Sequence, residues 1–278
     1  MSKNASGLNW TIGVLALAAA IAAGVYLARR PAPVPASKPP SMTAPAPASA
    51  AAPLERHPIT QAEVGPAPES PAPLPRLDDS DAAVADSLSA LLGGDDLKGL
   101  LAAQAIIPRI VATIDALPKR QLAPNILPVQ LPRGRFLTTR TDGRIVMSDA
   151  NAARYATYAR IADRIDTGAL VAWYVRYYPL FQQAYRELGY PDGHFNDRLV
   201  FVIDQLLATP DLDAPAAVRP YKSGYAFVDA RLESLSAGQK ALIRVGPANE
   251  ALIKDKLRGI RAALTGQAPP MPHGKPAE

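Results

Sequence analysis

The stretch DTGALVAWYVRYYPLFQQAYRELG, which runs from Asp166 to Gly189, decides the fold of this chain. Apolar and aromatic residues occupy almost every helical position in it, so little polar face remains. A helix that is apolar nearly all round is usually buried at the centre of a domain. We therefore expect a central helix here, kinked at Pro179 because proline removes one backbone hydrogen bond.

Helical patterns continue downstream of this stretch. A strongly periodic segment from Phe195 to Leu207 predicts a helix that Asp192 or Asn196 would cap. Further on, Ser236 and Gln239 have the spacing of a capping box. Gly246 and Pro247 are typical of the end of one helix and the start of the next. We expect two C-terminal helices from these signals.

Upstream of the central stretch, the pattern is helical and then turns to a hairpin. Ser80 can cap a first helix, and apolar residues repeat at helical spacing from Ile106 to Leu117. The segment from Phe136 to Met147 alternates around Asp142-Gly143, which is a strong hairpin signal. A helix is expected after Ser148. Residues 218–228 predict only a short irregular or strand segment.

The fold class that follows is mainly α, within the α+β class: a helical domain with one small β-hairpin. We place this domain at residues 76–265, because about 190 residues can bury some 70% of their surface in one core. The last stretch, residues 266–278, is Pro-rich and predicts a disordered tail.

Residues 1–30 predict a transmembrane anchor. No charged residue lies between Lys3 and Arg29, and Leu8 to Leu27 matches the roughly 20 apolar residues that cross a bilayer. The alternative is a cleaved signal peptide, but the apolar run is longer than the roughly 7–15 residues usual for one. Charges on the two sides of the span are nearly balanced, so they do not set its orientation. The absence of cysteine and the Pro/Ala-rich stretch after the span favour a periplasmic domain, and a cytoplasmic domain is the alternative. We expect a single-pass protein of the bacterial inner membrane with its domain in the periplasm.

Residues 31–75 predict a disordered, extended linker. They hold 14 prolines and 11 alanines. Proline fixes φ and donates no backbone hydrogen bond, so this composition favours polyproline II over a packed core. His57 lies in this linker and is expected to be solvated.

The sequence excludes several kinds of chemistry. It contains no cysteine, and His194 is the only histidine within residues 76–265. A thiol nucleophile and a site with two histidine ligands are therefore ruled out for one copy of the domain. No phosphate-binding loop, dinucleotide-binding loop or zinc-protease motif is present. We expect no cofactor, no metal and no catalytic residue, and the modest charge has no signature of nucleic-acid binding.

Candidate residues for a ligand or partner surface come from three features. The first is an aromatic stripe at helical spacing, with core packing as the alternative. It consists of Tyr174, Tyr178, Phe181 and Tyr185. The second is arginines among those rings, with a solvated face as the alternative. The third is the stretch from His194 to Arg198, in which an acid/base pair competes with helix capping. The candidates are Tyr174, Arg176, Tyr178, Tyr185, Arg186, His194, Asp197 and Arg198.

Several strings in the domain resemble a known family. They are FQQAYRELGYP at 181–191, FNDRL at 195–199, IDQLLATP at 203–210, VATID at 111–115, LAP at 122–124, LSAGQK at 235–240 and Gly246-Pro247. Together they resemble a bacterial family of unknown function, number 3014. The resemblance implies a membrane anchor, a low-complexity linker and one domain, and it implies no activity, cofactor or catalytic residue.

The functional expectation is a membrane-anchored, non-enzymatic interaction or scaffolding module of the cell envelope, with an envelope protein or glycan as its partner. The alternative is a carboxylate-dependent hydrolase of the cell wall, for which Glu187, Asp197 and Asp204 are the candidates.

Overall fold

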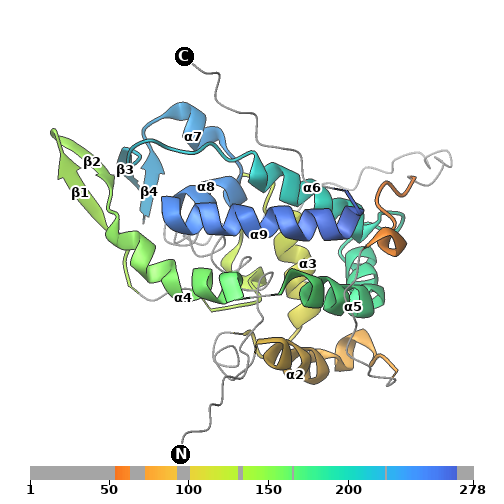
Figure 1. Ribbon diagram of the computed structural model, residues 1–278. Coiled ribbons are helices and arrows are strands. Elements are labelled where there is room, and N and C mark those ends of the chain that lie inside the picture. The colour runs from red at the N-terminus through yellow and green to blue at the C-terminus, as the bar shows by residue number, and fades with distance from the viewer. Residues whose placement is uncertain are drawn as a thin grey trace, which may run out of the picture.

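The computed structural model describes residues 54–62, 73–92, 101–130, 134–164, 166–222 and 224–267. This part of the chain is mainly helical, with two small antiparallel hairpins at one end (Figure 1). The α-helices are α2 (Asp81–Leu92), α3 (Ile106–Ala116), α4 (Ala150–Arg164), α5 (Thr167–Glu187), α6 (Phe195–Leu207), α7 (Ala230–Ser234), α8 (Ala237–Arg244) and α9 (Pro247–Thr265). Short 3-10 helices are η1 (Ile59–Gln61), η2 (Leu77–Asp79) and η4 (Pro124–Ile126).

The predicted central helix is confirmed as α5. Asp166 caps it, with its carboxylate accepting a hydrogen bond from the Ala169 amide at 2.7 Å. The helix continues through Pro179. It packs against α3, α6 and α9, and most of its apolar residues are buried. The central position therefore follows from its nearly all-round apolar surface.

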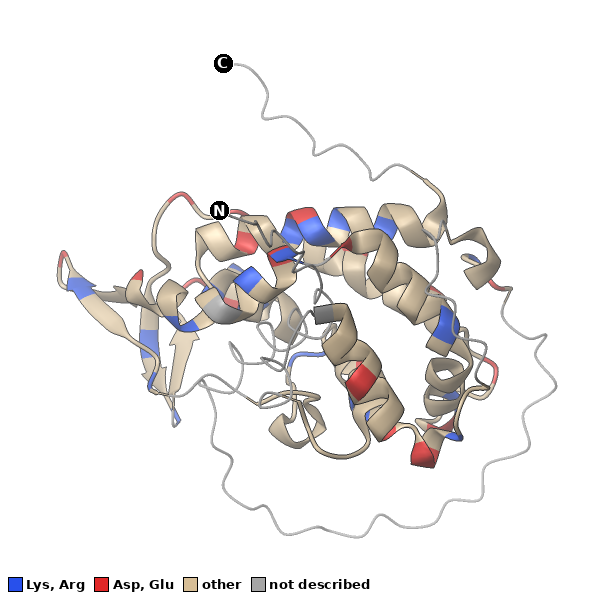
Figure 2. Ribbon diagram, turned by 60° about the horizontal axis from the view of Figure 1, so that its bottom comes forward, with Lys and Arg blue, Asp and Glu red and all other residues tan. Residues whose placement is uncertain are grey.

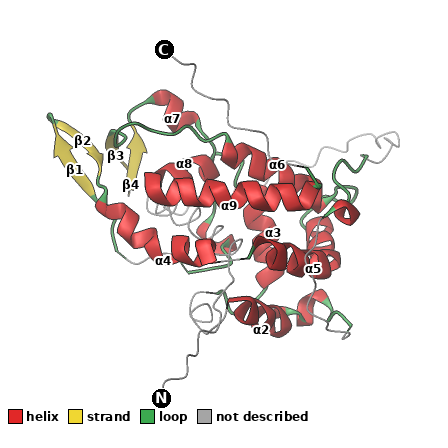
Figure 3. Cartoon of the chain, viewed as in Figure 1, coloured by secondary structure: helices red, strands yellow, loops and turns green. Residues whose placement is uncertain are grey.

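Helix α9 runs along the body from the hairpin end to the opposite end (Figure 3). The capping box predicted from Ser236 and Gln239 is confirmed at the start of α8. Gly246 and Pro247 join α8 to α9 as expected, and Gly246 has φ +91°, a value that favours glycine.

The start of α6 differs from the prediction. Its N-cap residue is His194, and neither Asp192 nor Asn196 caps it. The side chain of Gln182 on α5 serves the first turn instead, because its Oε1 accepts a hydrogen bond from the Phe195 amide at 2.9 Å. A partner from another helix has replaced the local cap that the sequence suggested.

The predicted hairpin is confirmed, and a second one stands beside it. Strands β1 (Thr138–Thr141) and β2 (Arg144–Met147) pair around Asp142 and Gly143, which both have positive φ. Strands β3 (Val218–Tyr221) and β4 (Gly224–Phe227) form the second hairpin, where the sequence predicted only a short irregular or strand segment.

The two hairpins share a small core of their own. A bridge from Val146 to Ala217 links them, and the Met147 amide donates to the Ala216 carbonyl at 3.0 Å. Between them lie the buried side chains of Phe136, Val218 and Phe227. These contacts across the chain stabilise the second hairpin, whose own sequence is a weak strand pattern.

The predicted anchor at residues 1–30 lies outside the described residues, as does most of the predicted linker. Within the described part of the chain, no helix has the length and apolar character needed to cross a bilayer. Of the predicted tail, only Gly266 and Gln267 are described.

One piece of the predicted linker, residues 54–62, lies against the domain. Ile59 and Ala62 pack on the main core, and η1 lies at the C-terminal end of α9. There Gly266 has φ +59°, and a Cβ at this position would come within 3.3 Å of the Gln61 carbonyl oxygen. For this piece the structure differs from the expected disordered, extended linker. His57, expected to be solvated, is instead half-buried and is part of the contact.

Candidate functional site

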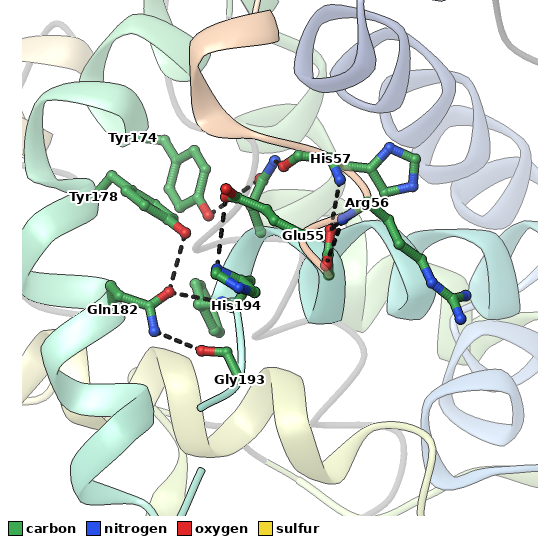
Figure 4. A network of polar contacts seen from close by, with 11 residues as sticks. Glu55, Arg56, His57, Tyr174, Tyr178, Gln182, Gly193 and His194 are labelled. Carbon is green, nitrogen blue, oxygen red and sulfur yellow. Dashed lines mark hydrogen bonds and ion pairs between the residues drawn. The ribbon is translucent and has the colours of Figure 1, made fainter. Parts of the chain in front are cut away.

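The docked piece of linker is held by the first turn of α6. The Asp197 carboxylate accepts hydrogen bonds from two successive backbone amides, at 2.9 Å from Arg56 and 2.7 Å from His57 (Figure 4). Asp197 lies near the N-terminus of α6, where the helix dipole stabilises a negative charge. A carboxylate that accepts hydrogen bonds from two amides binds them more strongly than a neutral acceptor would.

Asn196 adds a third hydrogen bond to the linker and connects it to the core. Its Nδ2 donates to the His57 carbonyl oxygen at 2.8 Å, and its Oδ1 accepts from the Tyr174 hydroxyl at 3.3 Å. The Asn196 side chain is 0% exposed. We call Asn196 and Asp197, together with the backbone of residues 56 and 57, the linker clamp. Every hydrogen bond of the clamp to the linker goes to main-chain atoms, so the linker's side-chain identities do not set these contacts.

Gln182 on α5 fixes the position of the clamp. Its Oε1 accepts from the Tyr178 hydroxyl at 3.0 Å as well as from the Phe195 amide. Its Nε2 donates to the Gly193 carbonyl at 2.6 Å. One amide side chain therefore ties α5 to the loop and first turn that carry Asn196 and Asp197 (Figure 4).

Charged and phenolic groups border the clamp. His194 Nδ1 lies 3.7 Å from Glu55 Oε1, and each of these side chains is about one third exposed. Burial and the nearby Glu55 carboxylate raise the pKa of Tyr178 to about 12. Burial also raises the pKa of Tyr174 well above its ordinary value. Both phenols are therefore neutral donors at neutral pH.

A second polar cluster centres on Asp115, at the end of α3. Its carboxylate lies 3.0 Å from Arg198 Nη2 and 2.7 Å from Lys119 Nζ. The Tyr190 hydroxyl donates to the same carboxylate at 3.3 Å, and the Tyr190 ring stacks on Tyr185 at 4.6 Å. This cluster ties α3 to α6 and to the loop after α5.

The structure places the predicted ligand-surface or partner-surface residues in different groups. Tyr174, Tyr178, His194 and Asp197 come together around the clamp. Tyr185 and Arg198 belong to the cluster around Asp115. The remaining two make other contacts: Arg176 lies over the Tyr177 ring, and Arg186 donates to the Gln182 carbonyl.

The aromatic stripe is part of the core, which was the alternative to an open groove. Tyr174 is 7% exposed and Tyr185 is 6% exposed. Their rings and that of Phe181 pack around Phe195, with centroid distances of 5.5–6.4 Å. Tyr178 is the one stripe residue that is only half-buried.

The acid/base chemistry considered for His194 and Asp197 does not match their contacts. His194 faces Glu55, and the Asp197 carboxylate is occupied by the linker amides. The other candidate acids also have partners: Asp204 pairs with Arg261, and Glu187 accepts from Gln183 at 2.9 Å. Within the described ranges, no cluster of three or more histidines and carboxylates could hold a metal ion.

A family model described as a protein of unknown function (DUF3014) matches residues 106–261, which are 156 of the 278 residues. The chain belongs to the DUF3014 family. The DUF3014 match runs from the start of α3 nearly to the end of α9. It includes Asn196 and Asp197, but it begins after the linker piece at residues 54–62 that they hold. No curated protein and no solved structure matches the chain.

Sequence reasoning missed Gln182, Asn196 as a hydrogen-bonding residue, and the linker piece itself. The first two sit in an apolar helix and a capping region, where local patterns suggest other roles. A usable signal did exist for the linker: LERH at 54–57 interrupts the Pro/Ala composition with an apolar and three polar residues.

Proposed function

We propose that this DUF3014 chain is a membrane-anchored, non-enzymatic interaction module of the bacterial cell envelope, with its domain in the periplasm. The apolar stretch within residues 1–30 supports an anchor, because its length suits a bilayer. The Pro/Ala-rich linker supports a domain that works at a distance from the membrane.

The linker clamp is the observation that carries this proposal. Asp197 and Asn196 contact only main-chain atoms of residues 56 and 57, two amides and one carbonyl. Arg56 and His57 lie in a bend of the chain, which turns both amides toward the one carboxylate. Such contacts suit a bent peptide of varied sequence, because every residue except proline offers the same groups. We therefore propose that the partner is a protein with a bent segment that takes the place of residues 56 and 57.

Competition with the linker sets the affinity that a partner needs. The linker is tethered to the clamp, so its effective concentration is on the order of millimolar. A partner segment must outcompete that internal ligand, which keeps weak and chance contacts from occupying the site. Release of residues 54–62 would also lengthen the free linker, so capture of a partner and reach from the membrane are coupled.

The geometry favours peptide contact over hydrolysis. The three carboxylates considered for a hydrolase each face their own partner: an arginine, a glutamine or the linker amides. A glycoside hydrolase needs two carboxyl groups facing one scissile bond.

The proposal is tested by opening the clamp in the full chain. In the test variant, proline replaces Arg56 and His57, which removes both amides that Asp197 binds, and a fluorescent peptide of residues 51–63 is added. We expect fluorescence anisotropy to report binding to this variant and much weaker binding to the wild type. Asp197→Ala in the same variant should abolish it, whereas Asp192→Ala, an exposed acid with no role in the clamp, should not. If the folded variant leaves the peptide free, the site is not a peptide site.

A further inference from the structure

The net positive charge of the domain is concentrated on the two hairpins. Residues 76–278 hold 25 basic and 22 acidic residues. Of these, five basic residues and one acidic residue fall within 134–147 and 216–228, the segments that form the hairpins. The rest is therefore close to neutral, with 20 basic and 21 acidic residues. The hairpins project from the helical body and carry basic positions along their length (Figure 2).

These five cations are exposed and have no carboxylate partner among the described residues. In the helical body, by contrast, Lys254, Arg198 and Arg261 pair with acids. The flanking acids Asp149, Asp213 and Asp229 lie before or after the strands, and Asp142 lies in the β1–β2 turn. We call the five cations and Tyr221 the hairpin surface. Its cations are Arg135, Arg140, Arg144, Arg219 and Lys222.

Apolar groups are exposed on the same hairpins. Tyr221 is 37% exposed, and both Arg219 and Lys222 lie over its ring, at 5.6 and 5.5 Å. Leu137 and Val228, next to the strands, are 42% and 57% exposed. An aromatic ring among cations suits the boundary between headgroups and acyl chains, where amphipathic rings prefer to lie.

We propose that the hairpin surface docks on a bilayer rich in anionic phospholipid. Each lysine or arginine near an anionic surface favours binding, and the four cations nearest the turns act together. The exposed apolar groups favour a lipid surface over a soluble polyanion, which offers them no apolar phase. The inference rests on the proposed function in one respect: the predicted anchor would keep the bilayer within reach of the domain.

The test uses the full chain, reconstituted into vesicles of phosphatidylcholine alone or with 30% phosphatidylglycerol. The chain has no cysteine, so Thr141→Cys gives a single site for an environment-sensitive dye at the β1–β2 turn. We expect a blue shift of the dye in the anionic vesicles only, and its loss at high salt, because salt screens charges. The test variant is Arg140→Gln, Arg144→Gln, Arg219→Gln and Lys222→Gln. The matched control, with the same net charge, is Arg76→Gln, Arg120→Gln, Arg164→Gln and Arg231→Gln.

Removal of each hairpin cation should lower the ratio of docked to free hairpins by about fivefold. The control variant should keep the shift. Equal dye spectra in neutral and anionic vesicles would overturn the proposal, and so would a shift produced by soluble polyphosphate in neutral vesicles. Flotation with neutral vesicles tests separately whether residues 1–30 anchor the chain in a bilayer. A chain that does not float with neutral vesicles refutes the anchor. The hairpin proposal is then judged on the anionic vesicles alone.

Discussion

Asn196 carries more of the linker contact than its type suggests. It is completely buried and links the Tyr174 hydroxyl in the core to the His57 carbonyl in the linker. A buried polar group that loses its partner has a large free-energy cost, whereas a satisfied one contributes little. Asn196 therefore belongs both to the core and to the clamp.

Asn196→Ala should lower the free energy of unfolding by about 1–3 kcal/mol, because it leaves the buried Tyr174 hydroxyl without an acceptor. Urea denaturation measures the change. The control is Asn125→Ala, an exposed asparagine at η4, which should leave the urea midpoint unchanged. Equal midpoints for both variants would show that the Asn196 contacts have no energetic weight.

Tyr178 reports whether the linker is in place. Burial, followed by the Glu55 carboxylate, raises its pKa from 10.0 to about 12. Because the pKa is higher in the folded than in the unfolded state, the stabilisation is complete below pH 10 and is lost as the pH rises through 12.

Glu55→Gln should lower the pKa of Tyr178 toward 10, because it removes the neighbouring negative charge. Tyrosinate absorbance during an alkaline titration measures the change, and Tyr178→Phe identifies which step belongs to this residue. A titration curve that Glu55→Gln leaves unaltered would mean that Glu55 lies away from Tyr178 in solution.

At the scale of elements, the buried lysine Lys254 joins α9 to the segment that leads into β3. Lys254 Nζ lies 2.9 Å from Glu250 Oε1 and 2.7 Å from Asp211 Oδ1, and it donates to the Thr209 carbonyl at 2.6 Å. Both Lys254 and Glu250 are almost completely buried. Burial raises the pKa of Glu250, against the opposing effect of Lys254. The contacts of Lys254 with Thr209 and Asp211 therefore hold the segment before the second hairpin against the helical body.

Lys254→Met should destabilise the domain by about 3 kcal/mol, because it leaves Glu250 buried without its cation. The double variant Lys254→Met, Glu250→Leu should recover most of that loss, since replacing both charges by apolar groups is often nearly neutral. Chemical denaturation of the single and double variants gives the comparison. A double variant less stable than the single one would contradict this account.

How well the elements follow from the sequence depends on the range of the interactions that form them. α5, the capping box at Ser236 and the Asp142-Gly143 turn are set by neighbouring residues, and all three are confirmed. The start of α6 depends on Gln182, and the second hairpin depends on contacts with β2. Neither dependence appears in a local pattern.

The candidate site also depends on contacts between residues that are far apart in the sequence. The clamp joins residues 139–141 positions apart in the sequence, so no periodicity or motif indicates it. Asp197 belongs to the clamp, and Tyr174, Tyr178 and His194 border it. These residues lie on α5 or at the start of α6, two helices that the sequence pattern predicts. The core position of Tyr174 and Tyr185 follows from Phe195, which fills the groove that those rings would otherwise form.

At the scale of the whole molecule, the account requires the domain to stand outside the inner membrane. Protease added to intact spheroplasts should therefore digest a tag at the C-terminus, while a cytoplasmic control protein stays protected. Digestion of the tag only after lysis would invert the orientation and refute an envelope partner.

The central claim is that Asp197 holds residues 54–62 on the domain. Trypsin cleavage after Arg56 tests it most directly, because the scissile bond lies between the two amides that Asp197 binds. The account predicts slow cleavage in the folded full chain and cleavage about tenfold faster in Asp197→Ala, with Asp192→Ala as slow as the wild type. Cleavage after Arg56 at the same fast rate in all three proteins would show that the linker is free, and would contradict the account.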